Sequence, residues 1–285
     1  MKLIRFGEPG KEKPGVLVGE KRYDVSALVP DYDEAFFETG GLELLQQIVD
    51  NRLGELSEIS TSERLGSPVP RPSKIICIGL NYVDHCIETN APIPTEPIIF
   101  FKSTTALCGP NDDVIIPKNS EKTDWEVELA FVMSKKASYV EEANAMEYVA
   151  GYCLHNDYSE RAFQLERGGQ WAKGKGCDTF APLGPFLATT NEIDDVNNLK
   201  MWLTVNGKSY QSSNTLNLVF KIPFLVHYLS QFMTLLPGDV ISTGTPPGVG
   251  LGIKPDPVYI KPGDVIQLGI EGLGTSKQVA VSYHK

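Results

Sequence analysis

Two glutamates separated by a single residue lie inside an apolar stretch of the sequence. Glu126 and Glu128 belong to segment 125–133, which reads Trp-Glu-Val-Glu-Leu-Ala-Phe-Val-Met and contains neither Pro nor Gly. This composition predicts a buried strand, on which residues two apart point to the same face. Two neighbouring carboxylates in an apolar environment repel each other and lose hydration, and a divalent cation would resolve that conflict. The spacing leaves open an edge strand with both glutamates facing solvent.

A third carboxylate completes a possible ligand set. Asp157 follows the next apolar segment, 151–155, and could supply a further oxygen. Three carboxylates without Cys or paired His suit a hard cation. We therefore expect these three side chains to bind Mg²⁺ first, with Mn²⁺ or Ca²⁺ as alternatives.

A possible general base precedes these carboxylates in the chain. His85 and Glu88 are three residues apart in segment 81–88, which is predicted to form one or two helical turns, so they share a helix side. A histidine oriented by a carboxylate is the usual general base near neutral pH. An exposed His–Glu pair without a catalytic role is the alternative that the spacing alone favours.

Several polar residues could hold an anionic substrate near the carboxylates. Lys102 ends a predicted strand, and Arg161 and Gln164 share one side of a predicted helix. The basic, glycine-rich loop 167–176 contains lysines that could bind an anion, although a plain surface loop would have the same composition. A second glycine-rich loop, 242–250, lacks the Gly-Lys-Ser/Thr ending of a phosphate-binding loop. It could instead present backbone N–H groups and a threonine hydroxyl to a ligand.

The elements that must position these residues are mostly strands. Segment 67–73 has three prolines in seven residues and predicts an extended linker between a small N-terminal α+β module, 1–70, and a larger unit, 71–285. In the larger unit, Asn206-Gly207 predicts a hairpin, and Pro-Gly-Asp-Val-Ile occurs twice, at 237–241 and 262–266, as a turn that begins a strand. An amphipathic helix is expected over 222–233, with Leu225, Tyr228, Leu229 and Phe232 inward.

Composition excludes some classes of partner. The chain has 285 residues, and 26 Lys and Arg against 36 Asp and Glu give a net charge of −10, which argues against nucleic-acid binding. No apolar run has the length of a membrane span or the form of a secretory signal, so we expect no membrane association. Five cysteines without a C-x-x-C pair are typical of reduced thiols in a cytoplasmic protein.

Four motifs together resemble the fumarylacetoacetate hydrolase superfamily, from about Lys74 to the C-terminus. They are Gly-Leu-Asn-Tyr-x-x-His-x-x-Glu at 79–88, Trp-Glu-Val-Glu at 125–128, Asn-Asp-x-x-x-Arg-x-x-Gln at 156–164 and Thr-Gly-Thr-Pro-x-Gly-Val-Gly at 243–250. The resemblance implies a β-rich α+β fold, a mixed β-roll of curved sheets around a metal, preceded by the small N-terminal module. It also implies a homodimer.

The resemblance assigns roles residue by residue. It implies metal ligands at Glu126, Glu128 and Asp157, and a catalytic dyad of His85 and Glu88. It implies substrate contacts at five residues: Arg161, Gln164, Lys173, Lys102 and Thr245. Of these, Lys173 would also be catalytic, through electrostatic stabilisation. Segment 160–175 is similar to bacterial 2,4-diketo-3-deoxy sugar acid hydrolases of rhamnonate and fuconate breakdown, sequences often labelled ureidoglycolate lyase. Segments 81–86 and 211–215 are also similar to animal proteins of the two-FAH-domain type.

The implied reaction is hydrolysis of a 2,4-dioxo acid. His85, oriented by Glu88, would deprotonate a water that attacks C4, and cleavage of C3–C4 would release a carboxylic acid and the enolate of pyruvate. The bound metal and Lys173 would stabilise that negative charge. The segment that carries the dyad, 81–95, is expected to close over the substrate together with 165–176. Two alternatives stay open: an oxaloacetate-type decarboxylase or isomerase with the same enolate chemistry, and a non-catalytic metal-bound scaffold.

Overall fold

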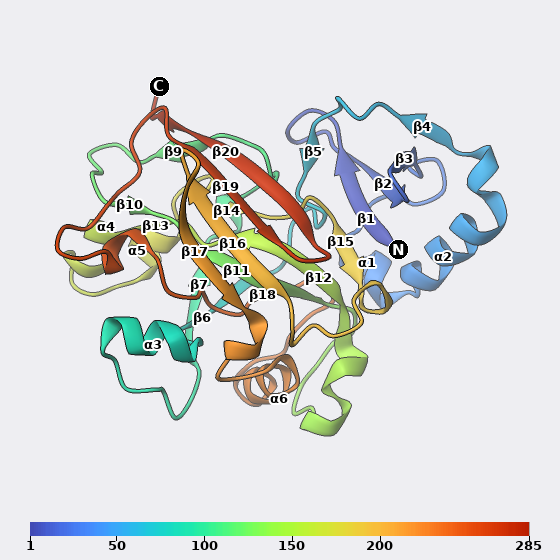
Figure 1. The fold of residues 1–285 in the computed structure, drawn as a ribbon. Helices are drawn as coiled ribbons and strands as arrows, with labels where there is room; N and C mark the ends of the chain where they lie inside the picture. Colours follow the sequence, from blue (N-terminus) through green and yellow to red (C-terminus); the bar gives the residue numbers. More distant parts are fainter. Residues whose placement is uncertain (285) are drawn as a thin grey trace.

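A sheet of eleven strands runs through the whole molecule in the computed structural model, which describes residues 1–284 (Figure 1). The strand order is β4-β3-β2-β1-β15-β12-β11-β18-β6-β7, and β5 pairs with β1 beside this path. The N-terminal elements, blue in Figure 1, are β1 (Lys2–Phe6), β2 (Lys13–Val18), β3 (Lys21–Asp24), α1 (Glu34–Glu38), α2 (Gly41–Arg52), β4 (Ser57–Ile59) and β5 (Leu65–Gly66).

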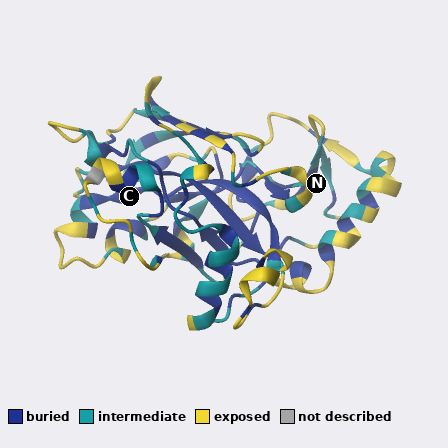
Figure 2. Cartoon of the chain, turned by 60° about the horizontal axis from the view of Figure 1, so that its bottom comes forward, coloured by how far each residue is buried: buried dark blue, intermediate teal, exposed yellow. Residues whose placement is uncertain are grey.

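The strands that carry the predicted carboxylates lie in the middle of this sheet. β11 (Val127–Met133) pairs with β12 (Val149–Asn156) on one side and with β18 (Val240–Ser242) on the other, and every residue of these three strands is buried (Figure 2). The predicted buried strand is therefore confirmed from residue 127 onward, and the edge-strand alternative is wrong. The sheet is completed by β6 (Ile75–Gly79), β7 (Ile98–Lys102) and β15 (Leu187–Thr189).

A second sheet of five strands packs against the first. Its order is β17-β16-β19-β20-β9, and β11 and β12 of the large sheet contact its strands β16, β19 and β20. The ring centroid of Trp125, just before β11, lies 4.7 Å from that of Tyr210 in β17. The predicted hairpin is present, and Asn206 and Gly207 both have the positive φ that its tight turn requires, 51° and 77°. The strands are β9 (Val114–Ile116), β16 (Lys200–Val205), β17 (Lys208–Asn214), β19 (Val265–Ile270) and β20 (Gly274–Ser282).

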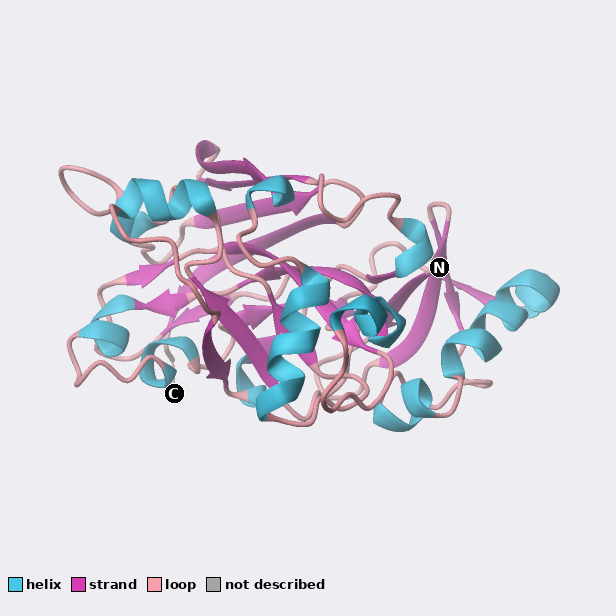
Figure 3. Cartoon of the chain, turned by 90° about the horizontal axis from the view of Figure 1, so that it is seen from below, coloured by secondary structure: helices cyan, strands magenta, loops and turns pink. Residues whose placement is uncertain are grey.

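Helices and short strand pairs surround these sheets (Figure 3). The two short pairs are β10 (Thr123–Asp124) with β13 (Ser159–Glu160), and β8 (Leu107–Cys108) with β14 (Ala181–Pro182). The remaining α-helices are α3 (Val83–Thr89), α4 (Arg161–Leu165), α5 (Ala172–Lys175) and α6 (Ile222–Phe232). The fold is thus α+β and rich in strands, as predicted. Within residues 1–284, none of the helices is both long and apolar enough to cross a bilayer.

Helix α6 differs in one detail from the prediction. Leu225, Val226 and Leu229 form its buried side, whereas Phe232 is 63% exposed. Tyr228 lies between the rings of Phe224 and Phe232, with centroids 5.8 and 4.9 Å away. The aromatic residues at four-residue spacing therefore contact one another along the outside of the helix, Phe224 and Tyr228 stacked and Tyr228 and Phe232 edge to face. The prediction that Tyr228 and Phe232 point inward is wrong.

The proline-rich segment 67–73 is packed against the molecule over part of its length. Ser67 and Val69 are buried, and the Ser67 hydroxyl donates to the Val69 carbonyl at 2.8 Å. β1 also pairs with β15, with Leu3 opposite Leu187, so the large sheet continues across the predicted boundary at residue 70. Whether 1–70 and 71–285 fold independently stays a prediction.

Candidate active site

The pairing of β11 with β12 brings the three predicted metal ligands together. Glu128 lies opposite His155 in the register, so Glu126 just before β11 meets Asp157 just after β12. The Asp157 N–H donates to the Glu126 carbonyl at 2.9 Å. One carboxylate oxygen from each of Glu126, Glu128 and Asp157 lies within 4.8 Å of the others, and all three residues are buried.

Buried cations neutralise two of these carboxylates. The Lys175 ammonium lies 2.6 Å from Glu126 Oε2 and 2.8 Å from Asp157 Oδ2. Lys102 pairs with Asp157 Oδ1, and Arg161 lies 2.6 Å from Glu126 Oε1. Burial raises the pKa of Asp157, but Lys102 and Lys175 outweigh it and hold that pKa below its usual value. For Lys175 the directions are opposite. Burial lowers its pKa, but the nearby Asp157 and Glu126 raise it by more, so that it ends above its usual value.

Glu128 has only neutral partners. Its Oε2 accepts from the Ser242 hydroxyl at 2.5 Å and from the Gly244 N–H at 3.1 Å, and no ion pair reaches it from residues 1–284. Burial, Asp157 and Glu126 raise its pKa well above the usual range. A hard divalent cation among these oxygen donors would supply the missing positive charge, so the residues fit the predicted metal.

A neutral histidine, His155, is linked to Glu128 through the hydroxyl of Ser242. His155 Nδ1 lies 2.7 Å from Ser242 Oγ, and its Nε2 is the one buried side-chain N or O atom within residues 1–284 without a hydrogen-bond partner. Burial lowers the pKa of His155 to about 3, so the ring is uncharged near neutral pH. If Ser242 donates to Glu128, it accepts from His155 Nδ1–H, which fixes the direction of the chain of hydrogen bonds.

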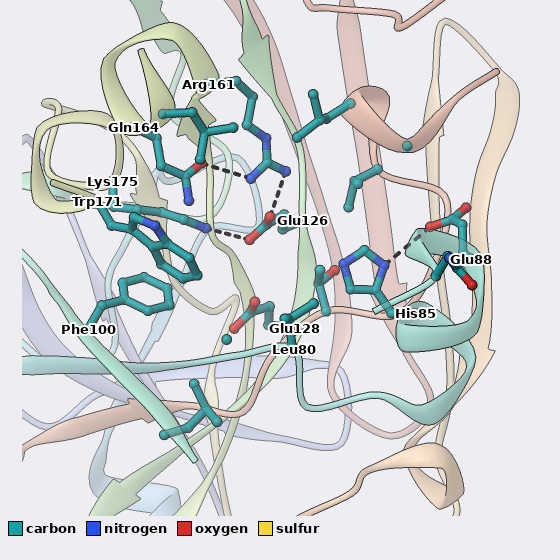
Figure 4. Close-up of a pocket in the computed structure, with 18 of the residues that line it drawn as sticks. Leu80, His85, Glu88, Phe100, Glu126, Glu128, Arg161, Gln164, Trp171 and Lys175 are labelled. Carbon is teal, nitrogen blue, oxygen red and sulfur yellow. Dashed lines mark hydrogen bonds and ion pairs between the residues drawn. The ribbon is translucent and has the colours of Figure 1, made fainter. Parts of the chain in front are cut away.

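The predicted dyad is formed at the other side of the same cavity. His85 Nδ1 lies 3.2 Å from Glu88 Oε2 on α3, and Figure 4 shows the ring pointing toward the carboxylates. His85 is buried and Glu88 is exposed, but both line the cavity, so the pair faces the cavity and is not the plain surface pair that its spacing alone favours. Asp84 holds α3 in place by accepting from Ser213 at 2.6 Å and from Asn217 at 2.9 Å.

One loop, 243–251, positions carboxylates from several parts of the site. Its Gly244 N–H donates to Glu128, and its Gly248 N–H donates to Glu88 at 3.0 Å. Gly248 has a φ of 99°, and a Cβ there would lie 1.9 Å from the Tyr210 carbonyl oxygen, so only glycine fits. The loop therefore ties the dyad to the metal ligands through its main chain.

The same loop orients Arg161 through a buried aspartate. Gly250 and Leu251 N–H groups donate to Asp124 at 2.6 and 3.0 Å, and Arg161 Nε donates to it at 2.8 Å. Burial lowers the pKa of Arg161, but Asp124 and Glu126 raise it beyond its usual value, so the guanidinium stays charged. Sequence reasoning missed Asp124, although its two-residue spacing before Glu126 was a usable signal.

These groups surround a cavity of about 590 Å³ (Figure 4). Arg161, Gln164 and Thr245, three of the predicted substrate contacts, line it. The Thr245 hydroxyl donates to the Val127 carbonyl at 2.9 Å and accepts from Gln211 at 2.8 Å. Lys102 lies behind Asp157, where its ammonium also donates to the Tyr158 carbonyl at 3.0 Å.

Lys173 does not lie where its predicted role requires. It is exposed, and its ammonium donates to the Arg167 carbonyl at 2.7 Å. Lys175 takes the buried position instead, because residues two apart on the short helix α5 point in different directions. The sequence showed a lysine in this loop but carried no local signal that distinguished the two.

Comparisons with known proteins agree with this geometry. The family model described as "Fumarylacetoacetate (FAA) hydrolase C-terminal" matches residues 74–281. A protein of Burkholderia multivorans named "Putative hydrolase" is 52% identical over 280 residues, which cover 98% of each chain.

Solved structures of the same fold carry several activities in their names. A fumarylacetoacetate hydrolase from Exiguobacterium antarcticum superposes with a TM-score of 0.88 at 32% identity, covering 99% of this chain and all of the other. A maleylpyruvate hydrolase from Sphingobium sp. SYK-6, in complex with manganese(II) and pyruvate, gives 0.84 at 31% with full coverage of both. A 2-hydroxyhepta-2,4-diene-1,7-dioate isomerase from Mycobacterium marinum gives 0.76 at 31%, again with full coverage of both. The chain therefore belongs to the fumarylacetoacetate hydrolase family.

Proposed function

We propose that this protein is a metal-dependent hydrolase that cleaves the C3–C4 bond of a 2,4-dioxo acid of the acylpyruvate type. The observation that carries the proposal is a cavity lined by a carboxylate-oriented histidine and by Glu126 and Glu128, which cluster with Asp157 directly behind the lining. The maleylpyruvate hydrolase with bound manganese(II) and pyruvate supports it, because that protein shares the fold over the full length. The products would be pyruvate and a carboxylic acid.

Glu126, Glu128 and Asp157 would hold the metal, which we expect to be Mg²⁺, with Mn²⁺ or Ca²⁺ as alternatives. When bound, the metal supplies Lewis-acid stabilisation of the negative charge on the carboxylate and 2-oxo end of the substrate. Arg161 and Lys175 lie beside the same carboxylates, so a substrate carboxylate would meet two further positive charges.

His85 is placed to act as the general base. Because Nδ1 faces Glu88, the other ring nitrogen, Nε2, would take a proton from a water molecule. The resulting hydroxide would add to C4, the C3–C4 bond would break with its electron pair on C3, and C3 would then be protonated. Glu88 orients the ring and stabilises its protonated form.

The sugar-acid resemblance of segment 160–175 makes 2,4-diketo-3-deoxy sugar acids the first candidate substrates. We also expect a homodimer, as the family resemblance implies, and a cytoplasmic protein, as the five cysteines without a C-x-x-C pair suggest. A second function, decarboxylation or double-bond isomerisation through the same enolate, is favoured by the isomerase of the same fold. In that reaction no water would need to be activated by His85.

The test measures both products from a panel of acylpyruvates, diketo sugar acids and oxaloacetate. Stripping divalent cations with EDTA should abolish pyruvate release, and Mg²⁺ or Mn²⁺ should restore it.

His85→Ala should lower kcat by roughly 10²–10⁴-fold while calorimetry shows nearly unchanged metal affinity, and Glu88→Gln should have a smaller effect. Full activity of His85→Ala on acylpyruvates, or of a rigorously metal-free preparation, would contradict the proposal. Pyruvate from oxaloacetate alone would identify the decarboxylase.

A further inference from the structure

The cavity has two chemically different parts. One part is lined by the carboxylates Glu126 and Glu128 and by the cations Arg161 and Lys175, and the dioxo head of a substrate would bind there. The rest of a substrate, its acyl group, must extend from there along the other lining residues. Those residues include seven with large apolar side chains: Ile78, Leu80, Phe100, Leu165, Trp171, Val249 and Leu251.

One wall is built from two aromatic rings. Phe100 and Trp171 meet edge to face with centroids 5.3 Å apart and an interplanar angle of 67°. The indole packs against the main chain at Gly79, where a Cβ would lie 3.0 Å from the ring. Figure 4 shows both rings on the far side of Glu126 from His85. The wall is therefore a continuous apolar surface beside the reaction centre.

Several polar side chains of the lining already have partners. Thr245 donates to the Val127 carbonyl and accepts from Gln211, and each guanidinium nitrogen of Arg161 donates to a different side chain. Two further polar residues of the lining, Asn90 and Lys254, are exposed. A buried hydroxyl that lacks a hydrogen bond is unfavourable, whereas a buried methylene is favourable.

We propose that this subsite selects an apolar acyl group, either alkyl or aromatic, over the polyhydroxylated chain of a sugar acid. Trp171 and Leu165 are then specificity-determining residues. The inference rests on the proposed function, because it assigns the part of the substrate beyond the dioxo head. It reverses the preference that the resemblance of segment 160–175 suggests.

A binding experiment tests the selection without turnover. N-Alkyl oxamates carry a similar carboxylate–carbonyl head but lack the C3–C4 bond that is cleaved. In the presence of Mg²⁺, calorimetry should show that N-butyl oxamate binds at least ~10-fold more tightly than an N-polyhydroxybutyl oxamate of equal chain length. Equal affinity, or tighter binding of the hydroxylated ligand, would overturn the proposal.

Variants then assign the selection to residues. Trp171→Gln should lower kcat/KM for hexanoylpyruvate ~10-fold while changing that for acetylpyruvate, whose acyl group is a single methyl, by less than about twofold. Leu165→Gln changes a half-exposed residue of α4 and should shift the same ratio in the same direction. Leu216→Gln is the matched control, because Leu216 is exposed and is not part of the lining. Equal losses on both substrates in Trp171→Gln and no shift in Leu165→Gln would show a merely structural role.

The two proposals fail in different ways. If the selective oxamate binding is present but no acylpyruvate is cleaved, the proposed hydrolase function is wrong and the apolar subsite stands. If acetylpyruvate is cleaved but hydroxylated chains are preferred, the hydrolase stands and the apolar subsite is wrong. If no oxamate binds in the presence of metal, the apolar subsite is wrong, and cleavage of acetylpyruvate alone decides the hydrolase function.

Discussion

At the scale of single residues, the site is a cluster of charges that nearly balance. Four buried carboxylates, Asp124, Glu126, Glu128 and Asp157, face three buried cations, Lys102, Arg161 and Lys175. With all seven groups ionised, one negative charge is left over, and Glu128 is the carboxylate without a charged partner in the described chain. A divalent cation would reverse the local sign and favour an anionic substrate. Metal and substrate should therefore bind cooperatively.

The two lysines of α5 give a sharp test of this arrangement. Lys175→Met should lower kcat by at least ~10²-fold, because the substrate loses a buried cation. It should not weaken Mg²⁺ binding, since it removes a positive charge that lies beside Glu126 and Asp157. Lys173→Met is the matched control and should leave both quantities unchanged. Calorimetry and steady-state kinetics measure them, and a large effect of Lys173→Met would restore the role predicted for it.

Residue-scale prediction from the sequence succeeded where a local repeat carried the information. The alternation expected of an extended segment places Glu126 and Glu128 together. Asp124 has the same spacing before Glu126 but ends β10, which pairs with β13 outside the large sheet. The prediction failed for Lys173, because the direction of a lysine on a four-residue helix depends on long-range packing. Ser242, which donates to Glu128, and His155, which bonds to Ser242, also come from strands distant in sequence and gave no local signal.

At the scale of elements, the strands of the large sheet fix the metal ligands, while a helix and a loop carry the dyad. α3 is tied to the second sheet through Asp84 and Ser213, and the residue after it, Asn90, has a φ of 52°. Farther along, Glu96 accepts from the Tyr228 hydroxyl of α6 at 3.1 Å. The segment between the contacts of Asp84 and of Glu96 is therefore the part of 81–95 that can move most easily without breaking strand pairs.

We therefore expect ligand-dependent ordering around the dyad. Hydrogen exchange of backbone amides in 86–95 and 166–171 should slow by ~10-fold or more when Mg²⁺ and oxalate are added, because closure protects these amides from solvent. Amides of β11 are the internal control and should be strongly protected in both states. Strong and equal protection of 86–95 with and without oxalate would show a rigid, preformed pocket instead.

Element prediction followed the strength of the local signal. The Asn-Gly hairpin and the two Pro-Gly turns specify their backbone geometry within a few residues, and they were predicted correctly. The outward direction of Tyr228 and Phe232 was missed, because apolar periodicity does not show which face of a helix meets the sheet. The packing of Ser67 and Val69 was missed for a related reason, since proline content describes chain stiffness and not burial.

At the scale of the whole molecule, the large sheet joins regions that the sequence divides. β1 adds the N-terminal strands to β15, which pairs in turn with β12, the strand that delivers Asp157. Leu3 and Ile4 of β1 are fully or almost fully buried, and Arg64 forms an ion pair of 2.6 Å with Asp112 across the predicted boundary. The N-terminal strands thus cover an edge of the sheet that carries the site.

Deletion of residues 1–70 should consequently destabilise the remainder instead of releasing an intact catalytic unit. It would expose the unpaired edge of β15 and the apolar surface that Leu3 and Ile4 cover, and open edges of this kind promote aggregation. We expect fragment 71–285 to be largely insoluble or to unfold at least ~10 °C below the full chain in thermal scans.

A chain cut at a protease site inserted in the exposed turn near Ser62 is the control, because it keeps every strand pair. This nicked protein should stay assembled, with nearly the unfolding temperature and metal affinity of the intact chain. If the deleted fragment were instead soluble, bound Mg²⁺ normally and unfolded at the same temperature, then 71–285 would be an independent domain, and the boundary expected from the three prolines would be real.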